Sequence, residues 1–288
     1  MDLIFFGIKS FYSFRLTLLF HEDAILGGYI VRLFPLLLGL IIFNNWLHKK
    51  NYILFAILFI LIDIIVYFSG ERTAIGLMFI FSIFIIFSLS KFKFFRLMTI
   101  IVSLILIIFL TLKLPELKHT NIDRTLNQIG IGNNIAANEM ENNKISKIYI
   151  FSQLHENWII TASNMFKHSP LFGLGPNQFR NHCNKEEFKS SEESCSTHPH
   201  NNYVQILAEI GLVGLIPLIV YIVHICRILI IHFFSSINKK YKRQSDYNIC
   251  LIACFVLTLF PFLPTQSFFS NWINIIYYMP IGFYLHSI

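Results

Sequence analysis

The sequence predicts a polytopic α-helical membrane protein, and its composition and long apolar runs carry that prediction. Of the 288 residues, 55% are hydrophobic and 14% are charged, and the mean hydropathy is +0.60. A soluble domain carries about 25% charged residues, so this chain has too few to cover a soluble core. Disorder is excluded because it requires low hydrophobicity and high charge. The apolar runs lack strict two-residue alternation, which indicates helices and not an outer-membrane barrel.

Seven apolar runs approach or reach the roughly 20 residues that a helix needs to cross a bilayer. They are residues 28–47, 52–68, 74–90, 97–114, 212–234, 249–263 and 272–286. The first four form an N-terminal membrane region (1–114), and the last three a C-terminal membrane region (203–288). Residues 1–20 are also apolar but carry Lys9 and Arg15. They are interpreted as an eighth span, an interfacial helix or the remnant of a longer chain.

Basic residues predict the orientation, because Lys and Arg collect in cytoplasmic loops. Nine lie in alternate short loops: Lys49, Lys50, Lys91, Lys93, Arg96, Lys239, Lys240, Lys242 and Arg243. The opposite short loops, 69–73 and 264–271, contain one basic residue, Arg72. This pattern places the C-terminus in the cytoplasm and a long loop, residues 115–202, on the other side. The net charge of +7 is therefore mainly a topology signal, and nucleic-acid binding is disfavoured.

The long loop is predicted to be solvated in its Asn-rich first half and folded in its second half. There Trp158 and Met165 belong to an apolar pattern with helical spacing, which Ser169-Pro170 would end. Cys183 and Cys195 lie twelve positions apart outside the reducing cytoplasm, which favours a disulfide. A Cys/His metal site is the alternative, but the spacing fits no standard ligand pattern, so no metal is predicted.

Arg72 and the segment around His200 are the residues that best fit a chemical role. Arg72 breaks the charge pattern, and a guanidinium can hold a phosphate through two hydrogen bonds; snorkelling or pairing with Glu71 is the alternative. His198 and His200 precede a helix for which Asn202 is the predicted N-cap, with Gln205 at the capping-box position. Imidazoles can act as general bases near neutral pH; a structural His-Pro turn is the alternative.

The helix after His200 is predicted to lie at the outer surface before the fifth span begins. Gly211 and Pro217 allow a bend between the two. Glu209 would bond its neighbours or end the polar surface of that helix. His155 and Arg180 are further loop candidates, and each alone is more often an exposed polar residue.

Four ordered motifs resemble the superfamily of O-antigen ligases and O-antigen polymerases, from about His21 to the C-terminus. The first span opens with HEDAILGGYIVRLFPLLLGL, similar to the family's Gly-then-Pro segment. The hairpin FSGERTAIG resembles the family's Ser-Gly-x-Arg motif. The family's Trp–Ala–Pro–Gly-x-Gly stretch resembles the loop passage HENWIITASNMFKHSPLFGLGPNQFR. HPHNNYVQILAEIGLVGL matches its His-Asn–x–Glu-x-Gly–x-x-Gly signature, which is the most specific of the four.

This resemblance implies an integral glycosyltransferase of the bacterial inner membrane with a GT-C-like architecture. Such an enzyme moves a glycan from undecaprenyl diphosphate to a sugar hydroxyl of a glycan or lipid A-core acceptor at the periplasmic face, without a metal or cofactor. By position, Arg72 would hold the donor diphosphate and His200 would be the catalytic His. Asn201 would support His200, His198 would contribute to substrate binding, and Glu209 would anchor the helix.

The sequence departs from the family in two respects. Many members carry a second loop Arg about four residues before the Trp, where this chain has Leu154; the resemblance leaves His155 or Arg180 to replace it. Members also usually have ten or more spans, so seven or eight indicate a shortened or fragmentary member. The remaining alternatives are a polymerase that uses the same donor, a transporter of the same lipid, and an inactive truncated member.

Overall fold

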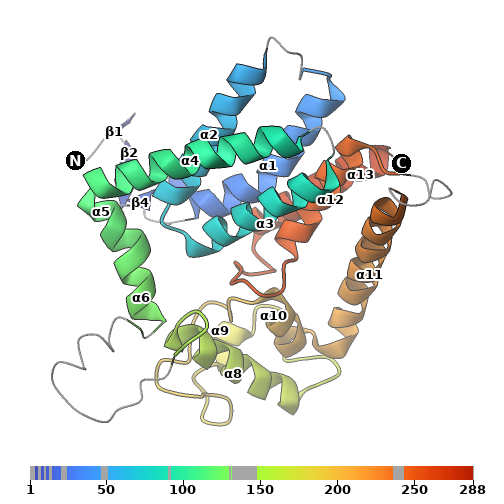
Figure 1. Ribbon diagram of the computed structural model, residues 1–288. Helices are drawn as coiled ribbons and strands as arrows, with labels where there is room; N and C mark the ends of the chain where they lie inside the picture. Colours follow the sequence, from blue (N-terminus) through green and yellow to red (C-terminus); the bar gives the residue numbers. More distant parts are fainter. Residues whose placement is uncertain are drawn as a thin grey trace. The chain divides into compact units, whose positions relative to one another are not determined.

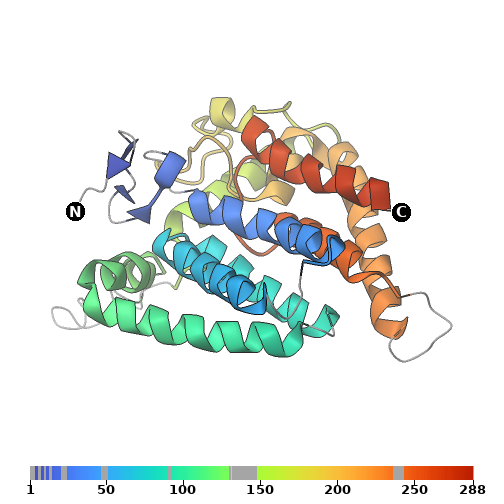
Figure 2. The same cartoon turned by 90° about the horizontal axis from the view of Figure 1, so that it is seen from above.

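The computed structural model is built mainly of helices (Figures 1 and 2). It describes residues 4–5, 8–9, 11–12, 15–20, 25–46, 51–89, 92–129, 131, 148–235 and 243–287. Near the N-terminus, β1 (Ile4–Phe5) pairs with β2 (Ile8–Lys9), and β3 (Phe11–Tyr12) with β4 (Arg15–Leu16), both antiparallel. One 3-10 turn, η1 (Leu18–Phe20), follows. The described part of residues 1–20 therefore forms short hairpins and a 3-10 turn, and not a spanning or interfacial helix. The rest of the described fold is helical, as the predicted α-helical class requires.

Each of the seven predicted apolar runs overlaps a helix, and further helices lie between residues 115 and 209. The helices are α1 (Leu26–Phe43), α2 (Tyr52–Phe68), α3 (Arg72–Ser88), α4 (Lys93–Lys113), α5 (Pro115–Lys118), the π-helix η3 (His119–Asp123), α6 (Arg124–Gln128), α8 (Gln153–His168), α9 (Phe179–His182), α10 (Asn202–Glu209), α11 (Gly211–Ser235), α12 (Asp246–Thr258) and α13 (Asn271–Ser287). Among the described residues, α1, α4 and α11 are long and apolar enough to cross a membrane. This agrees with an α-helical membrane protein, whereas the number of seven or eight spans stays a prediction.

The predicted sixth span, 249–263, extends too far. Helix α12 ends at Thr258, and residues 259–270 form turns and irregular chain. Pro261 explains the early end, because proline lacks an N–H and disfavours the helical conformation of the residue before it. Residues 259–270 contribute contacts to the candidate site.

The chain divides into two compact units, which are described separately. The first comprises Met1–Thr125, Gln244–Thr258 and Ile276–Ile288, and the second comprises Leu126–Arg243 and Leu259–Ile275. In the first unit α2 and α3 lie between α4 and the pair α1 and α12 (Figure 2). At its centre the ring of Phe34 meets those of Phe59 and Phe81 edge-on, with centroids 4.6 and 5.5 Å apart. Aromatic pairs in this geometry stabilise a core beyond the area they bury.

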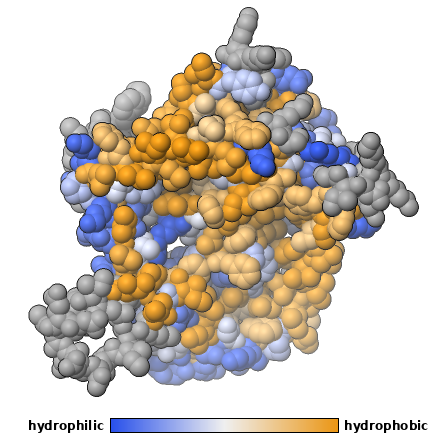
Figure 3. All heavy atoms as spheres, in the orientation of Figure 1, coloured by the Kyte–Doolittle hydropathy of each residue, from blue (hydrophilic) through white to orange (hydrophobic). Residues whose placement is uncertain are grey.

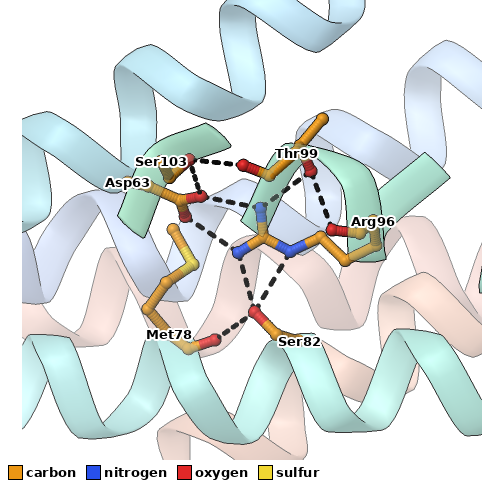
Figure 4. Close-up of polar contacts among 6 residues, drawn as sticks. All are labelled: Asp63, Met78, Ser82, Arg96, Thr99 and Ser103. Carbon is orange, nitrogen blue, oxygen red and sulfur yellow. Dashed lines mark hydrogen bonds and ion pairs between the residues drawn. The ribbon is translucent and has the colours of Figure 1, made fainter. Parts of the chain in front are cut away.

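A buried ion pair joins three helices of this unit (Figure 4). Arg96 donates to both carboxylate oxygens of Asp63, at 2.8 and 2.9 Å, and to Ser82 Oγ at 2.7 Å. Its side chain is 2% exposed. The prediction that Lys93 and Arg96 lie in a loop is therefore wrong, because α4 begins at Lys93. Bidentate pairing with Asp63 offsets the loss of hydration of the Arg96 guanidinium. Lys49, Lys50, Lys91, Lys239, Lys240 and Lys242 lie outside the described residues, so the orientation stays a prediction.

Helix α4 presents a broad apolar face to the outside. Figure 3 shows hydrophobic side chains gathered along it, in the orientation of Figure 1. They include Phe94, Met98, Ile101, Ile105, Ile108, Phe109 and Leu112, each at least half exposed. Exposed apolar surface of this extent on a helix of spanning length is typical of contact with lipid.

Candidate active site

The second unit is held together by an apolar cluster beneath its polar surface. Its buried members are Ala162, Met165, Phe179, Cys183, Phe188 and Ala208, with Trp158, Leu174, Cys195 and Val204 packed against them. The predicted amphipathic helix around Trp158 exists as α8, which Ser152 caps by accepting a hydrogen bond from the backbone N–H of His155. The core therefore fixes α8, α9 and α10 to one another, and these helices carry most of the candidate residues.

Three histidines and one tryptophan lie together in this unit. The ring of His200 stacks on that of Trp158, with centroids 4.6 Å apart and planes at 29°. Its centroid is 4.0 Å from that of His198 and 5.5 Å from that of His155. His155 Nδ1 in turn lies 2.7 Å from Ser152 Oγ. Side chains from α8 and from the segment before α10 thus form one cluster, called here the imidazole cluster (His155, Trp158, His198 and His200).

The backbone of His200 is held in an unusual conformation. Its φ is +53°, in the left-handed region that few residues other than glycine adopt. The backbone N–H of Thr265 donates to the carbonyl of His200 at 2.9 Å, and the His198 ring Nε2 lies 3.2 Å from the carbonyl of Thr265. Contacts with residues 259–275 therefore support the strained residue, as is common where a side chain must be aimed precisely for function.

Burial keeps both central imidazoles neutral. Desolvation, followed by the nearby His198 and His155, lowers the pKa of His200 to about 3. Desolvation also lowers the pKa of His198 to about 4, and Arg180 and His155 add to that shift. A neutral imidazole has a free lone pair and can accept a proton, which a charged one cannot. Ser196 Oγ lies 3.4 Å from His200 Nε2.

Helix α10 begins one residue earlier than predicted. Its N-cap is Asn201, whose side-chain oxygen accepts from the backbone N–H groups of Tyr203 and Val204 at 3.0 and 3.1 Å. The predicted cap Asn202 is instead buried and accepts from Thr265 Oγ1 at 2.8 Å. Gln205 makes no capping box, because its amide bonds Ser267, Phe268 and Glu209.

Glu209 connects α10 to the glycine-containing turn that follows α8. Its fully buried carboxylate accepts from the backbone N–H of Asn177 at 3.0 Å and of Phe179 at 2.9 Å. Gln205 Nε2 is a third donor, at 3.2 Å. Burial raises the pKa of Glu209, and these hydrogen bonds and Arg180 counteract the rise. The carboxylate thus fixes the turn and the start of α9 relative to α10.

Two glycines allow this turn to cross the junction of α10 and α11. Gly173 and Gly211 have φ of +65° and +72°. A Cβ on Gly173 would lie 2.4 Å from the backbone of Glu209, and one on Gly211 would lie 2.4 Å from the backbone of Leu171. The junction at Gly211 is the bend predicted between the surface helix and the fifth span. Gly173 of the Gly-x-Gly motif and Gly211 of the Glu-x-Gly motif therefore belong to one close contact.

The remaining loop candidates border the imidazole cluster. Cys183 and Cys195 are joined in a disulfide, with Cα atoms 5.0 Å apart, which ties α9 to the segment leading to His198. Arg180, on α9, is exposed and close enough to influence the pKa values of His198 and Glu209. Arg72, in contrast, belongs to the first unit, where it is the first residue of α3.

Sequence reasoning missed Thr265, Ser267 and the role of Trp158 as the surface on which His200 stacks. Pro261 and the polar run that begins at Thr265 were the available signals, since both are atypical of a span. Among the described residues, no group of three or more His, Cys, Asp or Glu side chains has the geometry to hold a metal ion.

Apolar helices of spanning length together with the imidazole cluster define the protein as a helical membrane protein with a candidate site of histidines. A family model described as O-antigen ligase matches residues 54–219, more than half of the chain. The chain therefore belongs to the O-antigen ligase family, whose members are glycosyltransferase-like membrane enzymes. No curated protein and no solved structure matches it.

Proposed function

We propose that the protein transfers a glycan from undecaprenyl diphosphate to a sugar hydroxyl of a glycan or lipid A-core acceptor, at the periplasmic face of the bacterial inner membrane. The observation that carries this proposal is the neutral His200. Its ring stacks on that of Trp158, and its backbone carbonyl accepts a hydrogen bond from Thr265. Family membership supports a ligase-type reaction in general. The donor, the acceptor and the roles below are the proposal.

In the proposed reaction, the acceptor oxygen attacks the anomeric carbon of the donor sugar. The bond between that carbon and the diphosphate oxygen breaks, the anomeric centre inverts, and His200 accepts the hydroxyl proton. The diphosphate leaves with the electron pair of the broken bond, and the proton passes to it or to water. A bound diphosphate also raises the pKa of a nearby imidazole, because an opposite charge favours the protonated form. His200 therefore becomes a better base when the donor is present.

Cations stabilise the negative charge that develops on the leaving diphosphate. Arg72 has this role by its place in the hairpin motif, and a guanidinium matches phosphate geometry. His155, which contacts His200, and the exposed Arg180 beside His198 are the groups that would replace the loop arginine of other members. Removing one such electrostatic contact typically costs ~2.7–4 kcal/mol of barrier.

Transport of the same lipid is disfavoured by the buried charges. A transporter places charged side chains along a path through the membrane. Arg96 and Asp63 instead bond each other, and Ser82, Thr99 and Ser103 bond the pair. These two charged side chains therefore hold α2, α3 and α4 together.

Complementation of glycan assembly tests the proposal. We expect His200→Ala and Arg72→Ala to lower transfer about 100-fold or more, while His168→Ala, an exposed imidazole of the same unit packed on Phe188, keeps wild-type transfer. Full transfer by His200→Ala would remove His200 from the mechanism. The product distinguishes the alternatives: a ligase attaches the glycan to lipid A core, and a polymerase lengthens the lipid-linked chain.

A further inference from the structure

We propose that Glu71 is a positioning residue for Arg72: its carboxylate fastens the hairpin 69–73 to the first turn of α1 and so fixes the backbone from which Arg72 projects. This inference rests on the proposed function, in which Arg72 holds the donor diphosphate. It concerns contacts within the first unit alone.

The carboxylate of Glu71 makes two hydrogen bonds to consecutive backbone groups. Oε1 accepts from the N–H of Gly27 at 2.5 Å, and Oε2 accepts from the N–H of Gly28 at 3.1 Å. The first N–H groups of a helix have no partner within it, and an anion there also interacts favourably with the helix dipole. Glu71 thus satisfies two such donors of α1 although it lies 43 or 44 positions away in the sequence.

The two glycines are required for this approach. A Cβ on Gly27 would lie 2.3 Å from Ser69 Oγ and 2.9 Å from the Cβ of Ala74, so the hairpin could not come this close. A Cβ on Gly28 would lie 3.0 Å from Glu71 Oε2, tighter than ordinary van der Waals contact. The Gly-Gly pair of the first span and the Glu of the hairpin are therefore two halves of one contact.

Further contacts hold the turn immediately before Glu71. Gly70 has a φ of +65°, and its carbonyl accepts from Arg15 Nη2 at 3.0 Å. Ser69 Oγ accepts from the backbone N–H of Glu71 at 3.3 Å and donates to the carbonyl of Val66 at 2.7 Å. The hairpin is therefore held at three successive residues, and Arg72 follows directly.

Several arginines surround this carboxylate. Arg32 on α1 and Arg15 on β4 interact with it electrostatically, and Arg124 on α6 repels both Arg15 and Arg72. Repulsion from Arg124 thus acts on the Arg72 guanidinium. A fixed backbone opposes displacement of Arg72, so the contact of Glu71 with α1 keeps Arg72 where a diphosphate can bind it.

The contact is sensitive to pH in the physiological range. Burial raises the pKa of Glu71 to about 7, although the bonds to Gly28 and Gly27 and the charges of Arg32 and Arg15 oppose the rise. Above that pH the carboxylate is ionised and accepts both N–H groups. Below it the proton occupies one oxygen, and the bidentate contact weakens. His200 and His198 titrate near pH 3 and 4, so they do not produce a transition near pH 7.

Kinetics of the full-length protein in liposomes, with a lipid-diphosphate-linked glycan as donor, test the inference. We expect Glu71→Gln and Gly28→Ala each to raise the KM for the donor about 10-fold or more, with a smaller change in kcat, because each loses a charge-assisted hydrogen bond. The double variant should be no worse than either single one, since both break the same contact. Gly282→Ala is the matched control, because outside its own helix backbone no atom of the described residues lies within 4 Å of the added methyl.

The pH profile separates positioning from a merely structural effect. We expect wild-type kcat/KM to fall as the pH is lowered through 7, Glu71→Gln to lack that fall, and Glu71→Asp to keep it with an intermediate KM. Amide hydrogen exchange gives a readout independent of activity: residues 26–29 should exchange faster in Glu71→Gln than in wild type or Gly282→Ala.

The outcomes distinguish this inference from the proposed function. Wild-type KM, pH profile and amide protection in Glu71→Gln would overturn the positioning role while leaving Arg72 in place. Full transfer by Arg72→Ala would overturn the role of Arg72, and with it this inference, even if the amides of Gly27 and Gly28 still depend on Glu71. If Glu71→Gln fails to fold, Glu71→Asp and Gly28→Ala decide by the same measurements.

Discussion

Among single residues, His198 and His200 make the stability of the second unit depend on pH. Their pKa values in the native state, about 4 and about 3, lie below the ordinary value of 6.5. Between the native and the ordinary pKa values the unfolded chain binds protons that the native state does not. The free energy of unfolding therefore falls as the pH is lowered through 6.5. Glu209 opposes this in part, because burial raises its pKa. Glu71 in the first unit also opposes it, because burial raises its pKa to about 7.

We therefore expect the melting temperature of the purified protein to fall between pH 7.5 and pH 5. His200→Phe, which keeps a ring on Trp158 but cannot titrate, should show a smaller fall. Thermal unfolding in detergent at both pH values measures this, with His168→Phe as the control for an exposed imidazole. Equal falls in wild type and His200→Phe would contradict the burial of a neutral His200.

Only the local contacts of the candidate site could be predicted from the sequence. The motif of His200 and Glu209 could be found in the sequence because the two residues lie only nine positions apart. The stacking of His200 on Trp158 could not, since it joins residues 42 positions apart whose meeting depends on how α8 packs on α10. The cap moved from Asn202 to Asn201 because Thr265, far along the chain, binds the Asn202 side chain.

Among the contacts of α2 with α4, the pair of Arg96 and Asp63 places two charges in the interior of the first unit. Asp63→Ala would leave a buried guanidinium without its counter-charge, and breaking such a pair typically costs about 3–5 kcal/mol. We expect a correspondingly large loss of stability, measured by denaturant unfolding in mixed micelles. The double variant Asp63→Leu with Arg96→Met removes both charges and should regain most of the loss. A double variant as unstable as Asp63→Ala would show that the charges themselves are required.

The turn that crosses the α10–α11 junction requires glycine at position 211. Gly211→Ala places a methyl 2.4 Å from the backbone of Leu171 and forces alanine to a φ of +72°; the left-handed conformation alone costs about 1–2 kcal/mol. We expect a strong loss of folded protein, measured as monodisperse yield after extraction. Gly282→Ala, with open space around it, should keep the wild-type yield. Normal yield and stability of Gly211→Ala would show that the turn does not pack as described.

The helices also show which parts of the fold the sequence could predict. The bounds of α2 coincide with the predicted run 52–68, because an uninterrupted apolar run leaves little choice. Helix α4 begins at Lys93 instead of residue 97, because Arg96 forms an ion pair with Asp63 between the helices. A charged residue favours a loop when its sequence neighbours alone are considered, but the ion pair with Asp63 allows Arg96 to lie in the helix.

For the whole molecule, the distribution of basic residues predicts that the second unit's polar helices face the periplasm and that Arg243 and Gln244 lie in the cytoplasm. Single cysteines introduced at Glu186, whose side chain is 85% exposed, and at Gln244 test this orientation. We expect a membrane-impermeant maleimide to label Glu186→Cys in intact cells and Gln244→Cys only after permeabilisation. The native Cys226, Cys250 and Cys254 lie in apolar helices, and the parent chain measures their background labelling. The opposite labelling pattern would place the imidazole cluster in the cytoplasm, away from a glycan donor presented at the periplasmic face.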